Sequence, residues 1–169
     1  MESLEAYDIH MTRDETYIRK AIELAEKALE QGEIPVGAIV VYKDRIIGEG
    51  INTTKTEHLS TGHAEIAAIN QANRYLGQDK LDGCELFSTL EPCLMCTGAI
   101  MNARIGRVVF GAFDRDAGAM GGKLDLSTVF FKHNAEILGG ILRERCEQLI
   151  QTFFEERRSK SVDNNYSLW

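Results

Sequence analysis

The sequence predicts an α/β fold in which helices cover both faces of a mixed β-sheet. Short apolar, β-branched runs alternate along the chain with longer amphipathic segments, and the first two runs are close enough to form a hairpin. Alternating strands and helices favour a sheet covered on both sides, and strands joined through a helix tend to be parallel. We therefore expect one antiparallel hairpin followed by a partly parallel sheet. The length suits a single domain spanning residues 1–169.

The first element is expected to be an amphipathic helix. Thr12 and Glu15 have the spacing of a capping box, which satisfies free backbone N–H groups at a helix start. Apolar side chains then recur at helical spacing through residues 18–29. Gly32 and Pro35 mark the end of this helix.

The remaining elements follow from the same two periodicities, and Lys43 and Asp44 provide the hairpin turn. Pro92 is expected in the first turn of its helix, where a missing N–H costs nothing. Residues 159–169 are expected to form a flexible tail. Strands are predicted at residues 36–42, 45–51, 84–89, 107–112 and 135–138, and helices at residues 63–76, 92–104 and 141–157.

Charge and hydropathy narrow the class of protein. The net charge is -7 and the pI is near 5.1, the wrong sign for holding nucleic acid by bulk attraction to phosphate. A local basic patch is compatible with this balance. The N-terminus has no basic stretch followed by an apolar one, and no apolar run is long enough to cross a bilayer. We expect a cytoplasmic protein that does not contact membranes.

Two short motifs carry the chemistry. The first is His63-Ala64-Glu65 at a predicted helix start, and the second is Pro92-Cys93-Leu94-Met95-Cys96 at another. Together they match the H-x-E and P-C-x-x-C pattern of zinc-dependent nucleobase deaminases. Either motif alone says much less, because C-x-x-C also occurs in structural zinc sites and redox pairs.

The residue types in these motifs suit a catalytic Zn²⁺ site. His63, Cys93 and Cys96 would supply three ligands and leave the fourth position to water, whose pKa then falls toward neutrality. Both cysteines are expected in a first helical turn, where the helix dipole stabilises thiolates. Glu65 is expected to shuttle protons as general base and then general acid.

Other cysteines and histidines are not expected at this site. Cys84 and Cys146 lie in apolar surroundings and are predicted to be small core residues. We expect His10 and His133 to face solvent; His58 is expected to do so too, with lining of the pocket as its alternative.

Several longer stretches resemble the bacterial tRNA-specific adenosine deaminases, within the cytidine deaminase-like superfamily. The resemblance runs from about residue 16 to residue 158, and its most specific part is residues 89–96. It rests on Glu33-Ile34-Pro35-Val36-Gly37-Ala38, Gly48-Glu49-Gly50-Ile51-Asn52, His63-Ala64-Glu65-Ile66, Thr89-Leu90-Glu91-Pro92-Cys93-Leu94-Met95-Cys96 and Ala103-Arg104-Ile105-Gly106-Arg107-Val108-Val109-Phe110-Gly111-Ala112.

This resemblance implies a three-layer α/β/α sandwich around a five-stranded mixed sheet, a homodimer, and conversion of adenosine to inosine at the wobble position of a tRNA anticodon arm. It also implies that Asn52 hydrogen-bonds the base and that the backbone of Ala64 faces it; for Asn52 the alternative is a routine turn residue. Of Phe153 and Phe154, one is expected in the core and the other beside the nucleotide.

The chain departs from the family where RNA contacts are expected. Asp116 stands where the family usually has lysine, Gly122 where it usually has serine, and the basic C-terminal tail is short. An acid at that point would repel phosphate. Two alternatives therefore stay open: a deaminase of a free base or nucleoside, such as guanine or cytosine, and a non-catalytic zinc-binding protein. An intact Glu65 argues against the latter.

Overall fold

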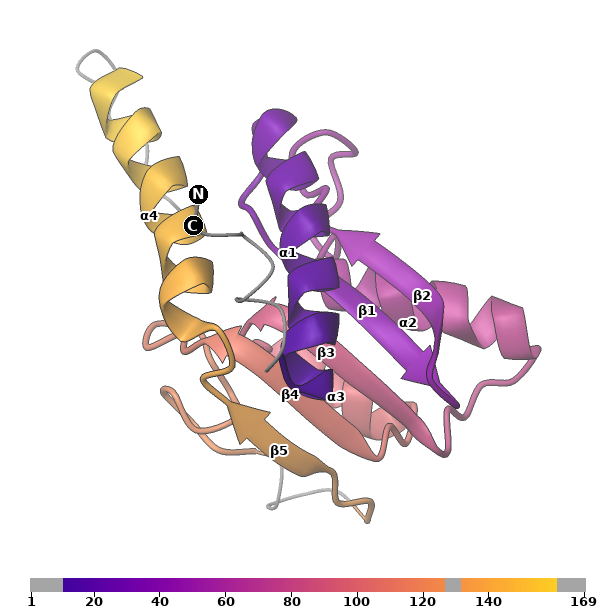
Figure 1. The fold of residues 1–169 in the computed structure, drawn as a ribbon. Helices are drawn as coiled ribbons and strands as arrows, with labels where there is room; N and C mark the ends of the chain where they lie inside the picture. The colour runs from indigo at the N-terminus through magenta and orange to yellow at the C-terminus, as the bar shows by residue number, and fades with distance from the viewer. Residues whose placement is uncertain (1–10, 127–131, 161–169) are drawn as a thin grey trace, which may run out of the picture.

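The computed structural model describes residues 11–126 and 132–160. The order of helices and strands along the chain follows the predicted alternation (Figure 1). The elements are α1 (Arg13–Glu30), β1 (Gly37–Tyr42), β2 (Arg45–Ile51), α2 (Ala64–Leu76), β3 (Cys84–Leu90), α3 (Leu94–Asn102), β4 (Arg107–Ala112), β5 (Glu136–Gly139) and α4 (Arg143–Lys160).

The five strands form one mixed sheet in the order β2-β1-β3-β4-β5. β1 runs antiparallel to both β2 and β3, whereas β3, β4 and β5 are parallel to one another. The parallel pairs need crossover connections, and α3 supplies the one between β3 and β4. The predicted five-stranded mixed sheet is therefore confirmed.

Helices cover both faces of this sheet, as Figure 1 shows. Successive strand residues point to opposite faces. Ala38 and Val40 of β1 pack in a cluster with α2 and α3, whereas Ile39 and Val41 pack with α1 and α4. The two clusters are the two halves of the core, and they make the molecule a three-layer α/β/α sandwich.

Local sequence signals account for most element boundaries. The Thr12 side chain accepts a hydrogen bond from the Glu15 N–H, and the Glu15 side chain accepts one from the Thr12 N–H, so the predicted capping box is present. Lys43 and Asp44 both adopt positive φ, the conformation of a type I′ hairpin turn. The predicted ranges of β2 and β4 agree with the structure at both ends.

A glycine allows α2 to approach the sheet closely. A Cβ atom at Gly50 would lie 2.0 Å from the Ala64 carbonyl oxygen, far inside van der Waals contact. Glycine therefore lets the first turn of α2 rest directly on β2. This contact fixes the start of the helix, and with it the residue that precedes α2, His63.

Several sequence-based boundaries differ from the structure, most by one or two residues, and two of these differences concern the metal-ligand cluster and the C-terminus. Pro92 does not lie in the first turn of α3, because Cys93 is extended and serves as the N-cap. Cys93 instead forms an isolated β-bridge with Gly118, which holds it outside the helix. Ser159 and Lys160, expected in the tail, belong to α4; the rest of that predicted tail lies outside the described residues. In the part of the chain that the structure describes, no helix has the length and apolar character of a membrane span.

Candidate metal centre and its cleft

Three potential metal ligands meet where two helices begin. His63 is the N-cap of α2, Cys93 is the N-cap of α3, and Cys96 lies in the first turn of α3. The His63 Nδ1 atom is 3.6 Å from the Cys93 Sγ atom and 3.5 Å from the Cys96 Sγ atom. Across residues 11–126 and 132–160, these three form the one group of His, Cys or acidic side chains with ligand atoms close enough to share a metal.

The spacing of these donor atoms fits a tetrahedral zinc ion. Zinc–sulfur bonds of about 2.3 Å and zinc–nitrogen bonds of about 2.0–2.1 Å, at a tetrahedral angle, place sulfur and nitrogen about 3.6 Å apart. The two measured separations of 3.5 and 3.6 Å match this value without rearrangement. Three protein donors are also the number typical of a catalytic site, which keeps one position for water or substrate.

The electrostatics of the cluster favour a thiolate at Cys93. Contact with the Cys96 side chain, with help from His63, lowers the pKa of Cys93 to about 4, whereas the same contact and burial raise the pKa of Cys96. The hydrogen bond with Cys93 in turn raises the pKa of His63. The N-terminus of α3 adds partial positive charge at the same place. The site therefore already holds negative charge of the kind that a divalent cation stabilises.

Glu65 lies beside the ligands in a buried position. Its side chain is 4% exposed, and its Oε2 atom accepts a hydrogen bond from the Cys96 Sγ atom at 3.5 Å. The buried Ser88 hydroxyl donates to the Glu65 Oε1 atom at 3.3 Å. Burial raises the pKa of Glu65. A raised pKa suits a carboxyl that has to act as both base and acid.

The cluster opens into a cleft of about 480 Å³. This size is in the range of pockets that enclose a small molecule such as a nucleoside. One wall comes from α4, and the floor includes Asn52, His63, Ala64 and Glu65. The other lining residues are Ile34, Val36, Leu90, Glu91, Cys93, Phe113, Asp114, Arg115, Asp116, Ala117, Arg143, Glu147, Ile150, Gln151 and Phe154.

Asn52 is held in the cleft by Glu33. The Asn52 Nδ2 atom donates to Glu33 Oε2 at 3.1 Å, and both side chains are buried. The other oxygen, Glu33 Oε1, accepts from the backbone N–H groups of Lys55 at 2.9 Å and Thr56 at 2.6 Å. One buried carboxylate thus orders the loop after β2 and fixes the amide of Asn52.

Glu91 orders the loop on the other side of the cleft in the same way. Its buried carboxylate accepts from the backbone N–H groups of Asp114 at 2.9 Å, Met120 at 3.0 Å and Gly122 at 2.6 Å. A Cβ atom at Gly122 would lie 2.2 Å from Glu91 Oε2, so glycine lets the loop close on this carboxylate. The closed loop brings Asp116 to the rim of the cleft.

The sequence analysis missed three of these polar residues: Glu33, Ser88 and Glu91. The available signal was a glutamate next to an apolar strand or a proline, at Glu33-Ile34-Pro35 and Leu90-Glu91-Pro92. Charged residues at such places are seldom fully buried unless they are paired or hydrogen-bonded.

The other cysteines and histidines lie away from the cluster. Cys84 and Cys146 are buried in the core, as predicted. His58 is exposed and is not among the residues that line the cleft. The expectation that His133 faces solvent is wrong, because it is half-buried with its Nε2 atom 2.7 Å from the Ile105 carbonyl oxygen. His10 lies outside the described residues.

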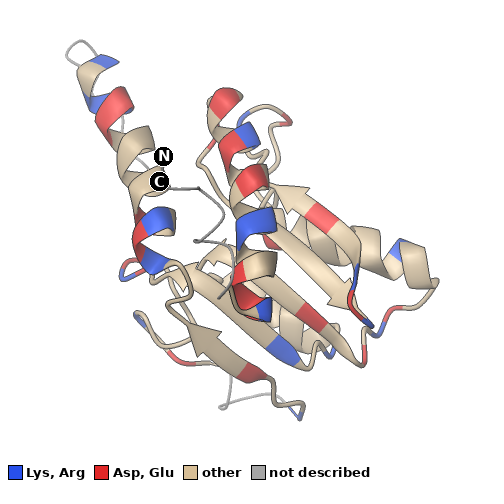
Figure 2. Cartoon of the chain, viewed as in Figure 1, with Lys and Arg blue, Asp and Glu red and all other residues tan. Residues whose placement is uncertain are grey.

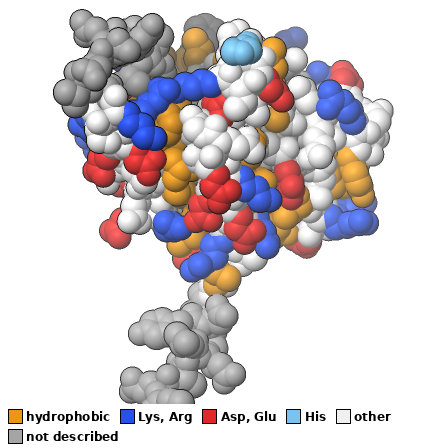
Figure 3. Space-filling view, turned by 90° about the horizontal axis from the view of Figure 1, so that it is seen from above, with side chains coloured by type: hydrophobic (Ala, Val, Ile, Leu, Met, Phe, Trp, Pro, Cys, Tyr) orange, Lys and Arg blue, Asp and Glu red, His pale blue; other side chains and the backbone are white. Residues whose placement is uncertain are grey.

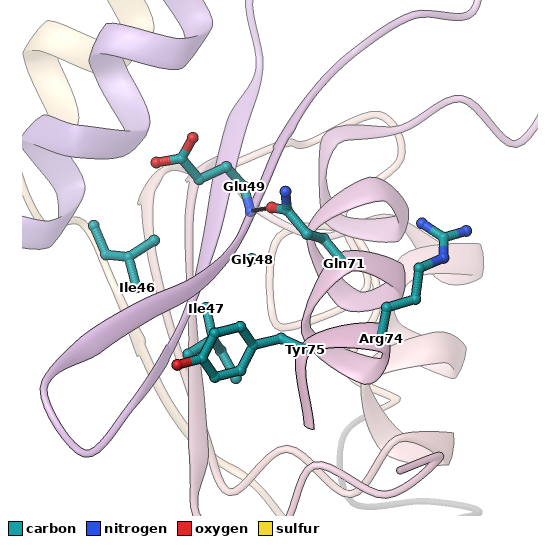
Figure 4. Close-up of a pocket in the computed structure, with 7 residues that line it drawn as sticks. All are labelled: Ile46, Ile47, Gly48, Glu49, Gln71, Arg74 and Tyr75. Atoms are coloured by element: carbon teal, nitrogen blue, oxygen red, sulfur yellow. Dashed lines mark hydrogen bonds between the residues drawn. The ribbon is translucent and has the colours of Figure 1, made fainter. Parts of the chain in front are cut away.

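A second hollow, of about 520 Å³, lies between β2 and α2 (Figure 4). There the Gln71 side chain accepts a hydrogen bond from the Glu49 backbone N–H, so it covers part of the strand edge. It is lined by Ile46, Ile47, Gly48, Glu49, Gln71, Arg74 and Tyr75, and none of these belongs to the metal-ligand cluster. Its side chains show no grouping that indicates chemistry.

Comparison with known proteins shows which family the chain resembles. Residues 11–112 match the family model of the cytidine and deoxycytidylate deaminase zinc-binding region. The tRNA-specific adenosine deaminase of Bacillus subtilis is 44% identical over 151 residues, which cover 89% of this chain and 94% of that protein.

Two solved structures show the same architecture. One comes from work on A-to-I editing by tRNA A34 deaminases at the wobble position of transfer RNA; it has a TM-score of 0.76 and 36% identity, over 79% of this chain and 98% of that one. The guanine deaminase of Nitrosomonas europaea has a TM-score of 0.74 and 25% identity, over 85% of each chain. The matched region 11–112 contains all three candidate ligands and Glu65.

Proposed function

The chain belongs to the cytidine and deoxycytidylate deaminase family, and from this premise we propose that it deaminates adenosine to inosine at the wobble position of a tRNA. That the protein is a zinc-dependent deaminase follows from the family and from the donor cluster. The single observation that carries the proposal is the convergence of His63, Cys93 and Cys96 on one point beside the buried carboxyl of Glu65.

We assign the zinc ion to His63 Nδ1 and to the sulfurs of Cys93 and Cys96. When bound there, zinc supplies Lewis-acid activation of a water molecule near neutral pH. The chain's own contribution is to hold the three donors at the spacing that zinc needs before it arrives. Because α2 and α3 are anchored on the same sheet, this spacing is set by the fold.

Glu65 is proposed to move the protons of the reaction. It accepts a proton from the attacking water and passes it to the purine ring nitrogen; it then takes the remaining proton of the added hydroxyl and delivers it to the exocyclic amine. The new C–O bond forms at the purine carbon that bears the amine, the C–N bond breaks, and ammonia leaves. Ser88 keeps the carboxyl aimed at this point through its hydrogen bond to Glu65 Oε1.

The base is proposed to sit between Asn52 and the α4 wall of the cleft. The amide of Asn52, held by Glu33, and the backbone of Ala64 would contact its polar edge, since both residues line the cleft. Phe154 also lines the cleft, whereas Phe153 is 4% exposed and belongs to the core. This division supports a flanking role for Phe154 beside the nucleotide.

The tRNA anticodon arm is the proposed partner, and a free purine is the second candidate substrate. The tRNA-specific adenosine deaminase of Bacillus subtilis matches this chain over most of both sequences, which favours RNA. Asp114 and Asp116 at the rim of the cleft, together with the structural likeness to a guanine deaminase, favour a small molecule.

A homodimer in the cytoplasm is part of the proposal. Leu94, which follows the proposed ligand Cys93, is 60% exposed, and Leu124 is 52% exposed, so apolar side chains are available for contact with a second copy. A tRNA substrate implies the compartment where tRNAs mature and function. Light scattering coupled to gel filtration tests the dimer, and a monomer mass at micromolar concentration would rule it out.

The substrate assignment is tested with a panel of candidate substrates. The zinc-loaded protein is incubated separately with an anticodon stem-loop that carries adenosine at the wobble position and with free guanine, cytosine, adenine and their nucleosides. We expect inosine in the RNA, detected by mass spectrometry of the digested nucleosides. Ammonia released only from a free base would replace the RNA assignment with the small-molecule one.

A further inference from the structure

Two cationic side chains meet on one aromatic ring at the edge of the cleft. The Lys55 Nζ atom lies 5.2 Å from the centroid of the Phe153 ring, and the guanidinium carbon of Arg157 lies 5.1 Å from the same centroid. Each is within the range of a cation–π contact. Lys55 comes from the loop after β2 and Arg157 from α4, so two distant segments deliver positive charge to one place.

Of the charges that act on Lys55, the attraction to Glu33 is weaker than the repulsion from Arg157. Neither cation forms an ion pair within the described part of the chain, and their mutual repulsion acts after burial as the second cause that lowers the pKa of Lys55. The nearby carboxylate of Glu33 is buried and already accepts hydrogen bonds from Asn52 and from two backbone N–H groups. Two like charges held together without a carboxylate partner favour an external anion.

The pair is connected to the cleft on both sides. Phe153 packs edge-on against Phe154, with ring centroids 5.3 Å apart, and Phe154 lines the cleft. Asn52, also in the cleft, shares the Glu33 carboxylate with the backbone of Lys55. These contacts place the backbone of Lys55 and the ring of Phe153 beside the cleft in which the base is proposed to bind.

The surroundings agree with an anion site in an otherwise acidic protein. Figure 2 marks Lys and Arg positions at the C-terminal end of α4, whose last turn carries Arg157, Arg158 and Lys160. Seen from above in Figure 3, Lys and Arg side chains form a band at the upper left of the molecule. Although the net charge is -7, the charged side chains are therefore unevenly distributed over the surface.

We propose that Lys55 and Arg157 together bind a backbone phosphate of the RNA, next to the nucleotide whose base enters the cleft. Arginine can engage two phosphate oxygens through its planar fork, and lysine adds a point charge. The inference rests on the proposed function and deepens it, because it assigns the phosphate contact to side chains other than the one at position 116. It also explains how an acidic chain engages a polyanion.

The test measures RNA binding by the zinc-loaded full chain over a series of salt concentrations, with fluorescence anisotropy of a labelled anticodon stem-loop. In the Lys55→Gln/Arg157→Gln variant, we expect the slope of log affinity against log salt to become shallower by about 0.7 to 0.9, the contribution of one neutralised phosphate. At about 0.1 M salt this corresponds to roughly 5- to 8-fold weaker binding. Each single variant should give about half the change in slope.

Two matched variants separate a local site from bulk charge. Lys43→Gln/Arg74→Gln removes the same charge from the hairpin turn and from the end of α2; Lys43 lies over Tyr42, at the end of β1 remote from the cleft. We expect it to leave the slope nearly unchanged, and Lys55→Arg/Arg157→Lys to keep most of the affinity. An equal loss in the Lys43/Arg74 variant would overturn the assignment.

The remaining outcomes distinguish this inference from the proposed function. Inosine formation by the wild-type protein reports the function independently of binding. If the wild type makes inosine and the Lys55/Arg157 variant binds RNA with an unchanged slope, the phosphate site is wrong and the function stands. If the variant instead changes only the KM for adenosine monophosphate, the site takes the phosphate of a free nucleotide. A wild type that does not bind the stem-loop also overturns the site.

Discussion

At the scale of single residues, the site depends on where four side chains are placed. His63, Cys93 and Cys96 stand at the starts of α2 and α3, and Glu65 is buried against them. Position matters as much as residue type, because Cys84 and Cys146 are also buried cysteines and serve only the core. Helix starts bring side chains from two elements to one point, and they add partial positive charge there.

Replacing the Glu65 carboxylate with an amide should greatly slow turnover and leave the metal in place. Glu65→Gln keeps the size of the side chain and removes the group that moves protons, so we expect kcat to fall by about 10²- to 10⁴-fold. Inosine formation and zinc content are measured on the same preparation. Glu23→Gln, in an exposed pair with Lys20 on α1, is the matched control and should behave as wild type. Turnover at the wild-type rate in Glu65→Gln would contradict the proposed mechanism.

At the residue scale, the candidate ligands were easier to predict from the sequence than the buried carboxylates that order the surrounding loops. The ligand types and their spacing are visible in His63-Ala64-Glu65 and Cys93-Leu94-Met95-Cys96, although their roles stay predictions. Glu33 and Glu91 were missed because their partners lie far along the chain. Glu91 accepts from N–H groups between 23 and 31 residues away. No local pattern indicates such a contact.

At the scale of elements, the close approach of α2 to β2 determines where His63 lies. Gly50→Ala would place a Cβ atom 2.0 Å from the Ala64 carbonyl oxygen, so α2 must shift or the strand must bend. Overpacking of this kind costs about 1–3 kcal/mol or more. We expect a lower free energy of unfolding and weaker zinc binding, measured by urea denaturation and competition with a chelator.

Gly98→Ala on α3 is the control for this prediction. A Cβ atom at Gly98 would meet nothing within 4 Å, and alanine is favoured over glycine in a helix by up to about 1 kcal/mol. Its stability should be equal to or greater than that of the wild type. Equal effects of Gly50→Ala and Gly98→Ala would show that the close approach of α2 does not matter.

A second element-scale prediction concerns the ion pairs between α1 and the sheet. Both terminal nitrogens of Arg107 donate to the Asp14 carboxylate at 2.7 Å, and one also donates to Glu85 at 3.1 Å. Figure 2 shows the acidic and basic positions side by side on β3 and β4. Hydrogen bonding to Arg107 lowers the pKa of Asp14 below its ordinary value of 3.8.

Because the pKa of Asp14 is lower in the folded state, its contribution is present above about pH 4 and is lost as the pH falls. We expect Arg107→Gln to lose about 1–2 kcal/mol at neutral pH. The difference from wild type should narrow below pH 4, where the carboxylates become protonated in both proteins. Urea denaturation at a series of pH values measures it, and a difference independent of pH would exclude the ion pair as its cause.

Most element boundaries followed from local signals, and the exceptions have physical causes. The capping box at Thr12 and the Lys43-Asp44 turn act within four residues, so the sequence shows them. The start of α3 moved because Cys93 pairs with Gly118 across the loop, a tertiary contact that keeps it extended. Local patterns cannot indicate a contact of that range.

At the scale of the whole molecule, the two cores on either side of the sheet hold the site together. Strand periodicity and the alternation of elements predicted helices on both faces, and the resemblance added the three layers and five strands, which the structure confirms. The strand order β2-β1-β3-β4-β5 could not be read from the residues, because it depends on how each crossover packs. A zinc ion at the proposed ligands would join the starts of α2 and α3 on this existing scaffold.

Removal of zinc should therefore destabilise the protein without unfolding it. A ligand at about 1,000 times its Kd stabilises the folded state by about 4 kcal/mol. For a chain of this size, about 2–4 °C of Tm per kcal/mol gives a fall of roughly 8–16 °C after chelation. Calorimetry with and without a chelator measures it, and far-ultraviolet circular dichroism at room temperature should not change. Loss of the folded state at room temperature would mean that the fold itself requires the metal.

The central claim is that two sulfurs and one imidazole hold a zinc ion that keeps a position for solvent. Zinc X-ray absorption spectroscopy on the full chain tests it most directly. We predict two sulfur scatterers at about 2.3 Å and two nitrogen or oxygen scatterers at about 2.0–2.2 Å, one of them imidazole. In the variant His63→Ala the imidazole signal should disappear. A shell of four sulfurs, or an imidazole signal that persists in that variant, would contradict the account.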